Sequence, residues 1–455
     1  MRALRPLATL AGLALAACAS SAVTGLPPED EAPLPPPVQL TAEEDHARTL
    51  EMLGIDELRP GRDGMNPDAP NYANYDEATS NPYPNLPPLL VFEDGTQVTD
   101  ASDWPRRRAE LILAFDAEVY GRTPDDLPGV SWEVVSEREE EIGGTPALVR
   151  ELIGRTDNAA YPAIDVPIEM TLYLPAEADG SVPAVLSFVF RFPEGVGPPP
   201  GWRPDPDPRE VVLGHGWALA EIVPTTAQAD NGAGLTEGII GLANRGQPRG
   251  ADDWGALKAW GWAASRGLDY LEAAPETDGA RVVIEGLSRY GKAVLVTMAY
   301  DERFAIGFSG SSGEGGGSLY RRDNGETLEN LASSGEYHWM GPRFLRYAGP
   351  LGVDDLPIDA HSLIALSAPR PLFLGTGTAE AGDAWVDPRG IYLATKAASP
   401  VWEMLGEAGL PDGEQPAPGD PAIGGTLVFR QHTGGHTNGP NWAAFLEFAD
   451  AHFGE

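Results

Sequence analysis

RVVIEGLSRYGK, residues 281–292, decides which fold and which chemistry to expect from this chain. Residues 281–284, RVVI, form a mostly apolar run with the length of a short strand, and residues 292–300 have the pattern of a helix. Between them, Gly286-Leu287-Ser288-Arg289-Tyr290-Gly291 is a G-x-S-x-x-G variant of the strand–turn–helix motif that exposes a nucleophilic serine. Small residues let the chain turn sharply, and backbone N–H groups at a helix N-terminus can stabilise an oxyanion. We therefore expect Ser288 to be a nucleophile, with a plain glycine-rich turn as the alternative.

Further strands and helices flank this motif on both sides. Continuous apolar runs predict buried strands at residues 182–190, 217–223, 304–309 and 371–375. Residues 254–273 carry apolar side chains at the 3–4 spacing of an amphipathic helix. Strands buried on both faces and separated by helices are typical of a mostly parallel sheet. The expected fold is therefore α/β, a doubly wound sheet with helices on both faces.

Composition excludes several classes of protein. The 455 residues include 68 Asp and Glu against 31 Lys and Arg, a formal net charge of −37. Nucleic-acid affinity depends on Lys and Arg that displace counterions, so we expect no nucleic-acid partner. The single cysteine excludes an internal disulfide, and no Cys/His cluster indicates a zinc site. We expect neither a metal nor a cofactor, and a monomer.

The first residues have the pattern of a bacterial export signal. Basic residues precede the apolar run 7–17, which is too short to span a bilayer. Leu15-Ala16-Ala17-Cys18 resembles a lipobox, in which Cys18 is lipidated after removal of residues 1–17. Residue 19 is Ala rather than Asp, which favours lipid anchoring in the outer membrane as the sole membrane attachment. An ordinary signal peptide with a chance cysteine is the alternative.

The rest of the chain divides into a tether and one domain. Residues 18–43 contain the Pro-rich and acidic stretch LPPEDEAPLPPPV, which cannot bury enough apolar surface to fold. We expect residues 44–455 to form a single catalytic domain. Within it, residues 85–175 are expected to pack on the sheet and add antiparallel strands.

A nucleophilic serine needs a base, and in triads of this chain order the histidine comes last. His436 lies in the loop between a predicted strand at 426–430 and a predicted helix at 442–453. His432 is the rival, but its place near the strand end suits a structural hydrogen bond better. We expect His436 to be the base.

The acid should follow a strand between the serine and the histidine. Asp383 follows the strand 371–375 by a short loop, where a carboxylate can accept the imidazole N–H. Asp387 is its neighbour, but it precedes Pro388 and is expected to cap the next helix. The spacing therefore favours Asp383.

Several motifs together resemble one enzyme family, the glucuronoyl esterases of carbohydrate esterase family 15. The most specific is Ser288-Arg289-x-Gly291-Lys292, and the resemblance covers about residues 70–453. The supporting motifs are Asp252-Asp253-Trp254-Gly255, Trp260-Gly261-Trp262, Asn74-Tyr75-Asp76-Glu77, Val119-Tyr120-Gly121-Arg122, Arg321-Arg322-Asp323-Asn324-Gly325-Glu326-Thr327, Asp359-Ala360-His361, Ala368-Pro369-Arg370-Pro371 and Phe445-Leu446-Glu447-Phe448-Ala449-Asp450.

This resemblance implies an α/β-hydrolase fold without a metal. It also implies cleavage of the ester between lignin alcohols and the 4-O-methyl-glucuronic acid branches of glucuronoxylan. By the same resemblance Ser288 is the nucleophile, His436 the base and Arg289 a donor to the oxyanion. A guanidinium aimed at developing negative charge stabilises it more than a neutral donor does. The substrate-binding residues would be Lys292, Glu326 and Trp385.

The acid position departs from one part of the family. Many members carry this acid in a Glu-Ser-Gly-x-Gly-Gly segment, whereas here residues 310–316 read GSSGEGG, so Ser311 takes its place. Other bacterial members use an Asp in an Asp-x-Trp-x-Asp-Pro segment, which Asp383 matches. Glu314 is displaced by three residues and could act only if its loop were rearranged.

The leading hypothesis is a glucuronoyl esterase that uses a Ser-His-Asp mechanism of acyl transfer. An acetyl-xylan or cinnamoyl esterase of the same fold is one alternative, because fold alone does not determine the substrate. A non-catalytic surface lipoprotein that binds glycan is another, since 11 Trp residues would suit sugar stacking. The ordered Ser, Asp and His argue against pure binding.

Overall fold

The computed structural model describes residues 34–81, 85–192, 196–197 and 204–454. The expected signal peptide 1–17, the lipidation site Cys18 and most of the expected tether lie outside these residues. Residues 36–455 form one compact unit. Within the described ranges, no helix is long and apolar enough to span a bilayer.

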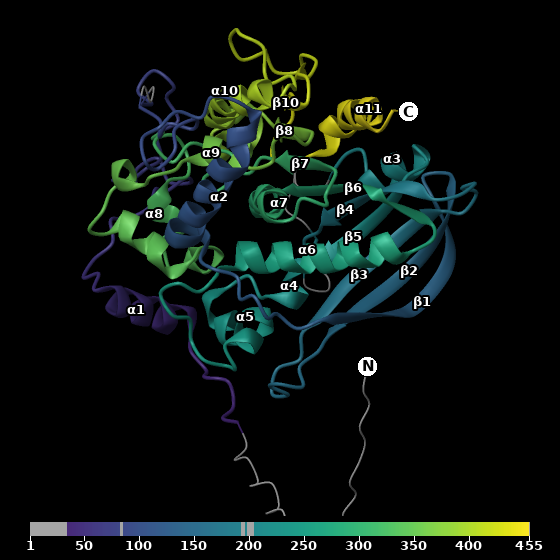
Figure 1. Ribbon diagram of the computed structural model, residues 1–455, viewed down its shortest axis with the longest axis horizontal. Helices are drawn as coiled ribbons and strands as arrows, with labels where there is room; N and C mark the ends of the chain where they lie inside the picture. Colours follow the sequence, from purple (N-terminus) through teal and green to yellow (C-terminus); the bar gives the residue numbers. More distant parts are fainter. Residues whose placement is uncertain (1–33, 82–84, 193–195, 198–203, 455) are drawn as a thin grey trace, which may run out of the picture. The chain divides into compact units, whose positions relative to one another are not determined.

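One mixed sheet organises this unit, and in the described chain its strand order is β1-β2-β3-β5-β4-β6-β7-β8-β10-β9 (Figure 1). Neighbouring strands from β5 to β10 in this order pair in parallel, while β1, β2, β3 and the edge strand β9 pair antiparallel. The strands are β1 (Val130–Ile142), β2 (Thr145–Thr156), β3 (Pro167–Pro175), β4 (Val182–Phe188), β5 (Ala218–Val223), β6 (Thr277–Leu287), β7 (Ile306–Gly310), β8 (Leu372–Thr376), β9 (Ile423–Gly424) and β10 (Leu427–Gln431). Residues 85–175 therefore add antiparallel strands, as expected, and they extend the same sheet.

Helices cover both faces of the sheet. Val282 and Ile284 of β6 belong to a large apolar core that α2, α6, α7, α9 and α10 share, whereas Val283 belongs to a second core with α3 and α11. Figure 1 shows α6 running across the front of the strands with α7 beside it. The helices are α1 (Ala42–Leu53), α2 (Trp104–Phe115), α3 (Pro208–Gly214), α4 (Pro224–Ala227), α5 (Gly238–Ala243), α6 (Ala256–Ala273), α7 (Arg289–Tyr300), α8 (Leu328–Leu331), α9 (Ala360–Ala365), α10 (Pro388–Met404) and α11 (Trp442–Phe453). The expected doubly wound α/β architecture is confirmed.

The strand and helix that flank Ser288 are longer than the sequence pattern predicted. β6 starts four residues before the apolar run and continues to Leu287, while α7 already begins at Arg289. The apolar run marks only the part of the strand buried on both faces, so polar strand residues at its ends escaped the prediction. Ser288 is consequently the only residue between strand and helix.

The domain begins earlier than the expected residue 44. Helix α1 starts at Ala42, and the Thr41 hydroxyl accepts from the Glu44 N–H while the Glu44 carboxylate accepts from the Thr41 N–H. This reciprocal cap fixes the helix start. Val38 already donates its N–H to the Gly246 carbonyl at 2.9 Å. The domain therefore starts before the boundary that we expected between residues 43 and 44. The capping residues are polar, so the sequence pattern does not distinguish them from the tether.

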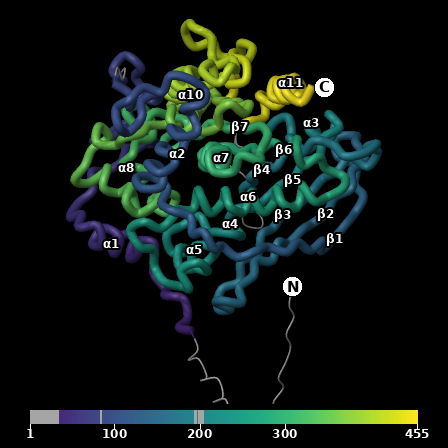
Figure 2. The backbone as a smooth tube through the Cα atoms, in the orientation of Figure 1, coloured from purple at the N-terminus to yellow at the C-terminus, as the bar shows by residue number. Residues whose placement is uncertain are grey.

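Helix α1 joins a distant part of the chain. It contacts the 3₁₀ segments Gly232–Thr236 and Pro342–Ala348. Figure 2 follows this segment, in purple, to its place beside the teal and green regions. Asp45 of α1 accepts a hydrogen bond from the Tyr337 hydroxyl at 2.9 Å. The first described helix therefore braces the segment that leads to Trp339.

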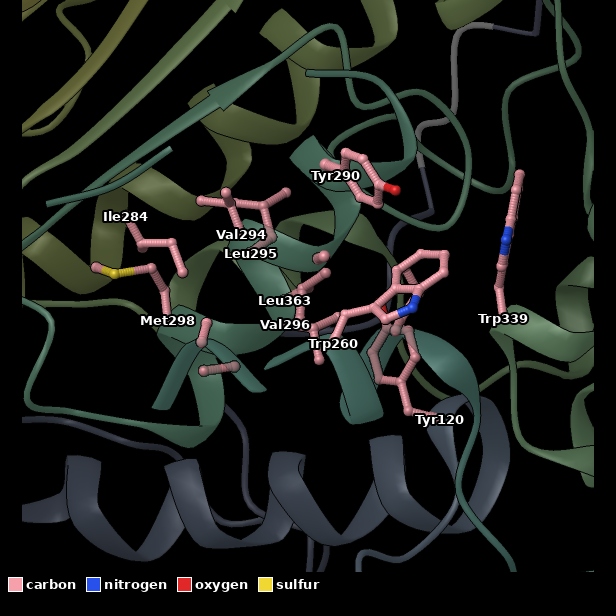
Figure 3. Close-up of a cluster of buried hydrophobic side chains, with 14 of the residues drawn as sticks. Tyr120, Trp260, Ile284, Tyr290, Val294, Leu295, Val296, Met298, Trp339 and Leu363 are labelled. Atoms are coloured by element: carbon pink, nitrogen blue, oxygen red, sulfur yellow. The ribbon is translucent and has the colours of Figure 1, made fainter. Parts of the chain in front are cut away.

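A dense aromatic core lies beneath α7. The rings of Trp260 and Tyr290 meet edge to face with centroids 5.3 Å apart, and Tyr120 is also fully buried. Figure 3 shows this group with Trp339 standing at its edge. Aromatic pairs of this kind contribute about 0.5–1.5 kcal/mol beyond the area they bury. The helix that begins at Arg289 is thus anchored by packing along its length.

Candidate active site

Ser288 sits on a strained turn. Its φ of 63° and ψ of −130° lie outside the regions that non-glycine residues favour, at a cost of about 1–3 kcal/mol. Its N–H donates to the Gly310 carbonyl at 2.8 Å, and its carbonyl accepts from the Lys292 N–H at 3.1 Å. These two bonds hold the turn between β7 and the first turn of α7.

The glycines of the motif are required by close approach. A Cβ at Gly286 would lie 2.6 Å from the Tyr290 carbonyl oxygen, and one at Gly291 would lie 2.5 Å from the Gly310 carbonyl oxygen. Real Cβ atoms do not come so close to backbone oxygens, so a side chain at either position would force the turn apart. The G-x-S-x-x-G spacing is therefore a packing requirement of the turn that presents Ser288.

His436 and Asp383 form a hydrogen-bonded pair. His436 Nδ1 lies 2.7 Å from Asp383 Oδ1, although the two residues are 53 positions apart in sequence. His436 follows β10 and comes before α11, while Asp383 ends a π-helical turn after β8. The Asp383 side chain is fully buried. The carboxylate contacts Nδ1 and so orients the imidazole, and the other ring nitrogen, Nε2, lies on the far side of the ring from Asp383.

The second oxygen of Asp383 is also satisfied. Its Oδ2 accepts from the Ser311 hydroxyl at 2.7 Å and from the Gly377 N–H at 2.6 Å. Ser311 follows β7 directly and has a positive φ of 42°. Sequence reasoning treated Ser311 only as an empty acid position. Its contact with a residue 72 positions away leaves no local signal in the sequence.

His432 and Glu314, the rival base and the rival acid, make other contacts. His432 lies 2.8 Å from the Thr437 carbonyl through Nε2, and its Nδ1 accepts from the Gly434 N–H at 3.0 Å. It thus stabilises the loop that contains His436. Glu314 is fully buried, and its backbone carbonyl accepts from the Lys292 ammonium. Burial raises the pKa of Glu314 well above its ordinary value.

Asp387 takes the N-cap position of α10, as expected, and the Gly390 N–H in the first turn is among the groups that lower the pKa of its carboxyl. Its Oδ2 also accepts from Arg322 Nε at 2.7 Å, and both side chains are nearly fully buried. Burial raises the pKa of Asp387 to about 6 against the opposing effect of the Arg322 charge. The buried guanidinium lies 65 residues away, so the sequence pattern showed only the proline that follows.

Arg289 is held by a group of residues that sequence analysis missed. Its Nη1 donates to Asp230 Oδ2 at 2.5 Å, and its guanidinium lies 5.2 Å from the centroid of the Trp339 ring. Asp230 Oδ1 accepts from Trp339 Nε1 at 2.7 Å and lies 2.9 Å from His338 Nε2. Burial alone would raise the pKa of Asp230, but His338, Arg289 and Trp339 together lower it. Asp230 is therefore ionised, and its carboxylate holds the Arg289 guanidinium in an ion pair.

One donor of Arg289 remains unsatisfied. Its Nε is buried and has no hydrogen-bond partner among the residues that the structure describes. Buried donors without a partner are rare, and in a pocket they mark a place where a ligand or water binds. The residue after Ser288 thus offers a charged donor beside the serine.

Lys292 and Glu326 form a second buried ion pair. Lys292 Nζ lies 2.7 Å from Glu326 Oε2, and the two side chains are 4% and 5% exposed. The Glu326 N–H donates to the Trp385 carbonyl at 2.9 Å. Lys292 lies 5.6 Å from the Trp339 ring centroid, so Trp339 borders both cations of the site. The expected uronate-binding residues therefore lie together.

A pocket of about 280 Å³ gathers these groups. It joins every site residue expected from the sequence except Cys18. Its lining consists of Ser288, Arg289, Lys292, Ser311, Ser312, Glu326, Glu336, Trp339, Gly382, Asp383, Trp385, Val386 and His436. Across the described residues, no group of three or more His, Cys, Asp or Glu side chains is placed to hold a metal ion.

Comparisons with known proteins identify similar esterases. The family model "Glucuronyl esterase, fungi" matches residues 249–406. A carbohydrate esterase from an unknown prokaryotic organism is 32% identical over 422 residues, which cover 84% of this chain and 93% of that protein. A 4-O-methyl-glucuronoyl methylesterase of Wolfiporia cocos is 27% identical over 345 residues, 72% of this chain and 73% of that protein.

A solved structure extends the likeness over the whole domain. The CE15 glucuronoyl esterase from Teredinibacter turnerae is 43% identical, with a TM-score of 0.85, and the match covers 91% of this chain and 100% of that one. The resemblance inferred from the sequence motifs is thereby confirmed. With this fold and this sequence similarity, the chain belongs to the glucuronoyl esterases of carbohydrate esterase family 15, carboxylic ester hydrolases with an α/β-hydrolase fold.

Proposed function

We propose that this esterase cleaves the ester between lignin alcohols and (4-O-methyl-)glucuronic acid of glucuronoxylan by a Ser-His-Asp mechanism. The observation that carries the mechanism is the 2.7 Å contact between His436 Nδ1 and Asp383 Oδ1 in the pocket that Ser288 lines. A histidine oriented by a buried carboxylate, in one pocket with a serine on a strained turn, is the arrangement that activates a hydroxyl.

The proposed mechanism assigns a residue to each step. Ser288 attacks the uronoyl carbonyl while His436 takes the hydroxyl proton. Asp383 holds the imidazole in the tautomer with its proton on Nδ1 and stabilises the imidazolium that forms. His436 then gives its proton to the departing alcohol oxygen. A water molecule, deprotonated by His436, attacks the acyl-enzyme and releases the uronate.

Arg289 stabilises the tetrahedral oxyanion in this proposal. Its ion pair with Asp230 and its contact with Trp339 hold the guanidinium before substrate arrives. Donors that are oriented in advance stabilise developing charge without a reorganisation cost. The N–H groups at the start of α7 add further donors.

The polar lining supports a sugar acid as the acyl group. Lys292 and Glu326 offer a donor and an acceptor to sugar hydroxyls, and Trp385 offers an aromatic wall. An acetyl or cinnamoyl esterase would be expected to line its acyl pocket with small or apolar side chains. The name of the Wolfiporia cocos relative, a 4-O-methyl-glucuronoyl methylesterase, also favours this substrate class.

Comparing turnover on two esters tests the proposal. We expect benzyl glucuronate to be hydrolysed with a far higher kcat/KM than 4-nitrophenyl acetate. Ser288→Ala should lower turnover on the glucuronate ester at least about 10³-fold while the circular dichroism spectrum stays unchanged. Retained activity in Ser288→Ala would contradict the mechanism. Preference for the acetate ester would contradict the substrate.

For localisation we propose export and lipidation at Cys18, with the outer membrane as destination and the domain acting as a monomer. Support comes from the sequence alone, from the lipobox at Leu15-Ala16-Ala17-Cys18. Cys18→Ser should release the protein from the membrane fraction of a bacterial host, and a variant that still sediments with membranes would contradict lipidation. Light scattering of the purified domain would test the monomer.

A further inference from the structure

A buried hydrogen bond joins the loop that carries His436 to the strand that leads to Ser288. Asn438, two residues after His436, donates from Nδ2 to Glu285 Oε1 at 2.5 Å. Glu285 lies on β6, three residues before Ser288, and is 153 positions away from Asn438 in the sequence. Glu285 is 5% exposed and Asn438 is 4% exposed. The loop of the base and the strand of the nucleophile are therefore held together by two side chains that water does not reach.

The Glu285 carboxyl is also fixed from the neighbouring strand. Its Oε2 accepts from the hydroxyl of Ser187, which lies opposite it in the parallel pairing of β4 with β6. Val185 and Val283, two positions earlier on these strands, belong to the core that α3 and α11 share, so Ser187 and Glu285 lie on the same face. The His436 loop leads into α11 on that face. Glu285 is thus a fixed point to which the loop is attached.

Asn438 packs on the end of β7 as well. A Cβ added at Gly310 would lie 1.7 Å from Asn438 Oδ1, so glycine at this position leaves room for the amide. The Gly310 carbonyl is the group that accepts from the Ser288 N–H at 2.8 Å. Asn438 Oδ1 has no hydrogen-bond partner among the described residues, so the amide is held through Nδ2. The Asn438 side chain therefore lies against both strands that hold the Ser288 turn.

The contacts that orient the imidazole come from another strand. Asp383, which contacts His436 Nδ1, follows β8, and the Thr378 N–H after β8 donates to the Gly434 carbonyl at 2.9 Å. These contacts place the ring relative to β8. Proton transfer also requires the ring to be placed relative to Ser288, which follows β6. The bond between Asn438 and Glu285 links the loop to that strand.

We propose that Glu285, acting through Asn438, is a positioning residue that sets the distance between the His436 imidazole and the Ser288 hydroxyl. This inference rests on the proposed Ser-His-Asp mechanism. A base takes the proton of a nucleophile within hydrogen-bond reach, and a misplacement of about 1 Å can cost about 10²-fold in rate. Without the bond to Glu285, the loop is free to shift away from β6. Neither residue touches the substrate in this role.

Two substitutions of Glu285 separate the hydrogen bond from packing. Glu285→Leu keeps most of the side-chain volume and removes the acceptor, whereas Glu285→Gln keeps an acceptor for the Asn438 amide. At pH 7, Glu285→Leu should lower kcat about 10–100-fold with KM changed less than about threefold. The loss should be equal on methyl glucuronate and on 4-nitrophenyl acetate, because both esters need the same proton transfer. Glu285→Gln should restore kcat to within about threefold of wild type.

Asn438→Ala tests the same bond from the side of the loop. We expect a loss of kcat similar to that of Glu285→Leu, and little further loss in the double variant, because both changes remove one interaction. Thr156→Val is the matched control. It removes a buried hydrogen bond of 2.8 Å from Thr156 of β2 to the Val166 carbonyl, and it should lower stability without changing kcat. Urea unfolding shows which variants are folded in the assay.

Three results would overturn the positioning role of Glu285. These are wild-type kcat in folded Glu285→Leu, losses that add in the double variant, and a loss confined to KM or to one ester, which would indicate substrate binding. If Glu285→Leu does not fold, Asn438→Ala and Glu285→Gln decide the question by the same criteria. An equal loss of kcat in Thr156→Val would show that lower stability alone explains the effect.

Labelling by phenylmethylsulfonyl fluoride distinguishes this inference from the proposed function. The reagent reacts with a serine that a histidine activates, and it needs no sugar for recognition. Labelling should be slowed in Glu285→Leu by about the same 10–100-fold factor as kcat. If wild-type protein is not labelled at Ser288, the proposed mechanism is wrong. If wild-type protein is labelled and active, and folded Glu285→Leu is labelled equally fast, only the role of Glu285 is wrong.

Discussion

The Ser311 hydroxyl donates to Asp383 Oδ2 at 2.7 Å, on the carboxylate oxygen opposite to the one that contacts His436. Ser311 follows β7, and Asp383 follows the neighbouring strand β8. By the motif resemblance, residue 311 is where many family members carry their acid. The two alternative acid positions therefore lie within hydrogen-bond distance of each other, because adjacent parallel strands end at the same edge of the sheet.

Asp383→Asn should cut kcat on methyl glucuronate by about 10³–10⁴-fold with little change in KM. The amide cannot stabilise an imidazolium, and it favours the wrong tautomer of His436. Steady-state kinetics at pH 7 provide the measurement. Glu314→Gln is the control and should be mild, since the Glu314 carbonyl, which the substitution keeps, makes the contact with Lys292. A crippled Glu314→Gln beside an active Asp383→Asn would move the acid to Glu314.

Ser311→Glu should partly rescue Asp383→Asn. A glutamate at residue 311 has one more rotatable bond than an aspartate and starts from the strand next to β8, so it can reach His436. We expect a recovery of about tenfold or more in kcat of the double variant over Asp383→Asn, as a second carboxylate restores the stabilised imidazolium. No gain in a folded double variant would argue that position 311 cannot reach the ring.

Asp230→Asn should lower kcat/KM for methyl glucuronate about 10–100-fold, the range typical when a residue that orients a metal ligand is changed, because Asp230 orients Arg289 in a similar way. Its carboxylate holds Arg289, and the amide would leave the guanidinium free to leave the oxyanion position. His338 and Trp339 keep an oxygen to contact, so the fold should survive. Asp252→Asn removes an exposed ion pair with Arg343 and serves as control. Equal kinetics in both variants would remove the positioning role of Asp230.

Asp387→Asn should destabilise the domain by about 3 kcal/mol, the loss expected when one partner of a buried ion pair is removed. The Arg322 side chain is 2% exposed and would lose its buried counter-charge, with the exposed Glu77 as its remaining carboxylate partner among the described residues. Urea unfolding gives the free energy. Glu77→Gln should cost less than about 1 kcal/mol. If the two variants lose the same stability, Asp387 is not the main partner of Arg322.

Sequence patterns predicted the parallel part of the sheet because its strands are buried on both faces and read as continuous apolar runs. They also predicted that Asp383 and His436 would approach each other, since strand ends and chain order constrain both. Strand β1 was not located within the expected antiparallel region, because most of its side chains are exposed and six of its 13 residues are charged. Its antiparallel pairing with β2 leaves one face open to solvent.

The sequence did not predict contacts that depend on tertiary folding. Asp230 meets Trp339 across 109 positions and Arg289 across 59 positions, with no spacing rule to connect them. The same holds for the pairing of Asp387 with Arg322, which lies 65 positions away in the sequence. Packing determines which distant segments form buried ion pairs. The sequence therefore predicted the motif residues of the candidate site but not the residues that support them.

Glu285 provides a test of pH-dependent stability close to the His436 loop. It is buried at the end of β6, and its Oε1 accepts from the Asn438 amide at 2.5 Å, two residues after His436. Burial raises the pKa of Glu285 to about 7, against the hydrogen bonds from Ser187 and Asn438.

The folded protein therefore holds this proton more tightly than the unfolded chain does. The stabilisation is fully present below about pH 4.5 and is lost as the pH rises through about 7. Glu285→Gln removes this dependence, so its free energy of unfolding relative to wild type should rise by up to about 3 kcal/mol between pH 5 and pH 8. Urea midpoints across this range give the measurement, with Glu57→Gln as the exposed control. A difference between Glu285→Gln and wild type that stays constant with pH would mean that Glu285 is ionised throughout, held by Ser187 and Asn438 as a carboxylate.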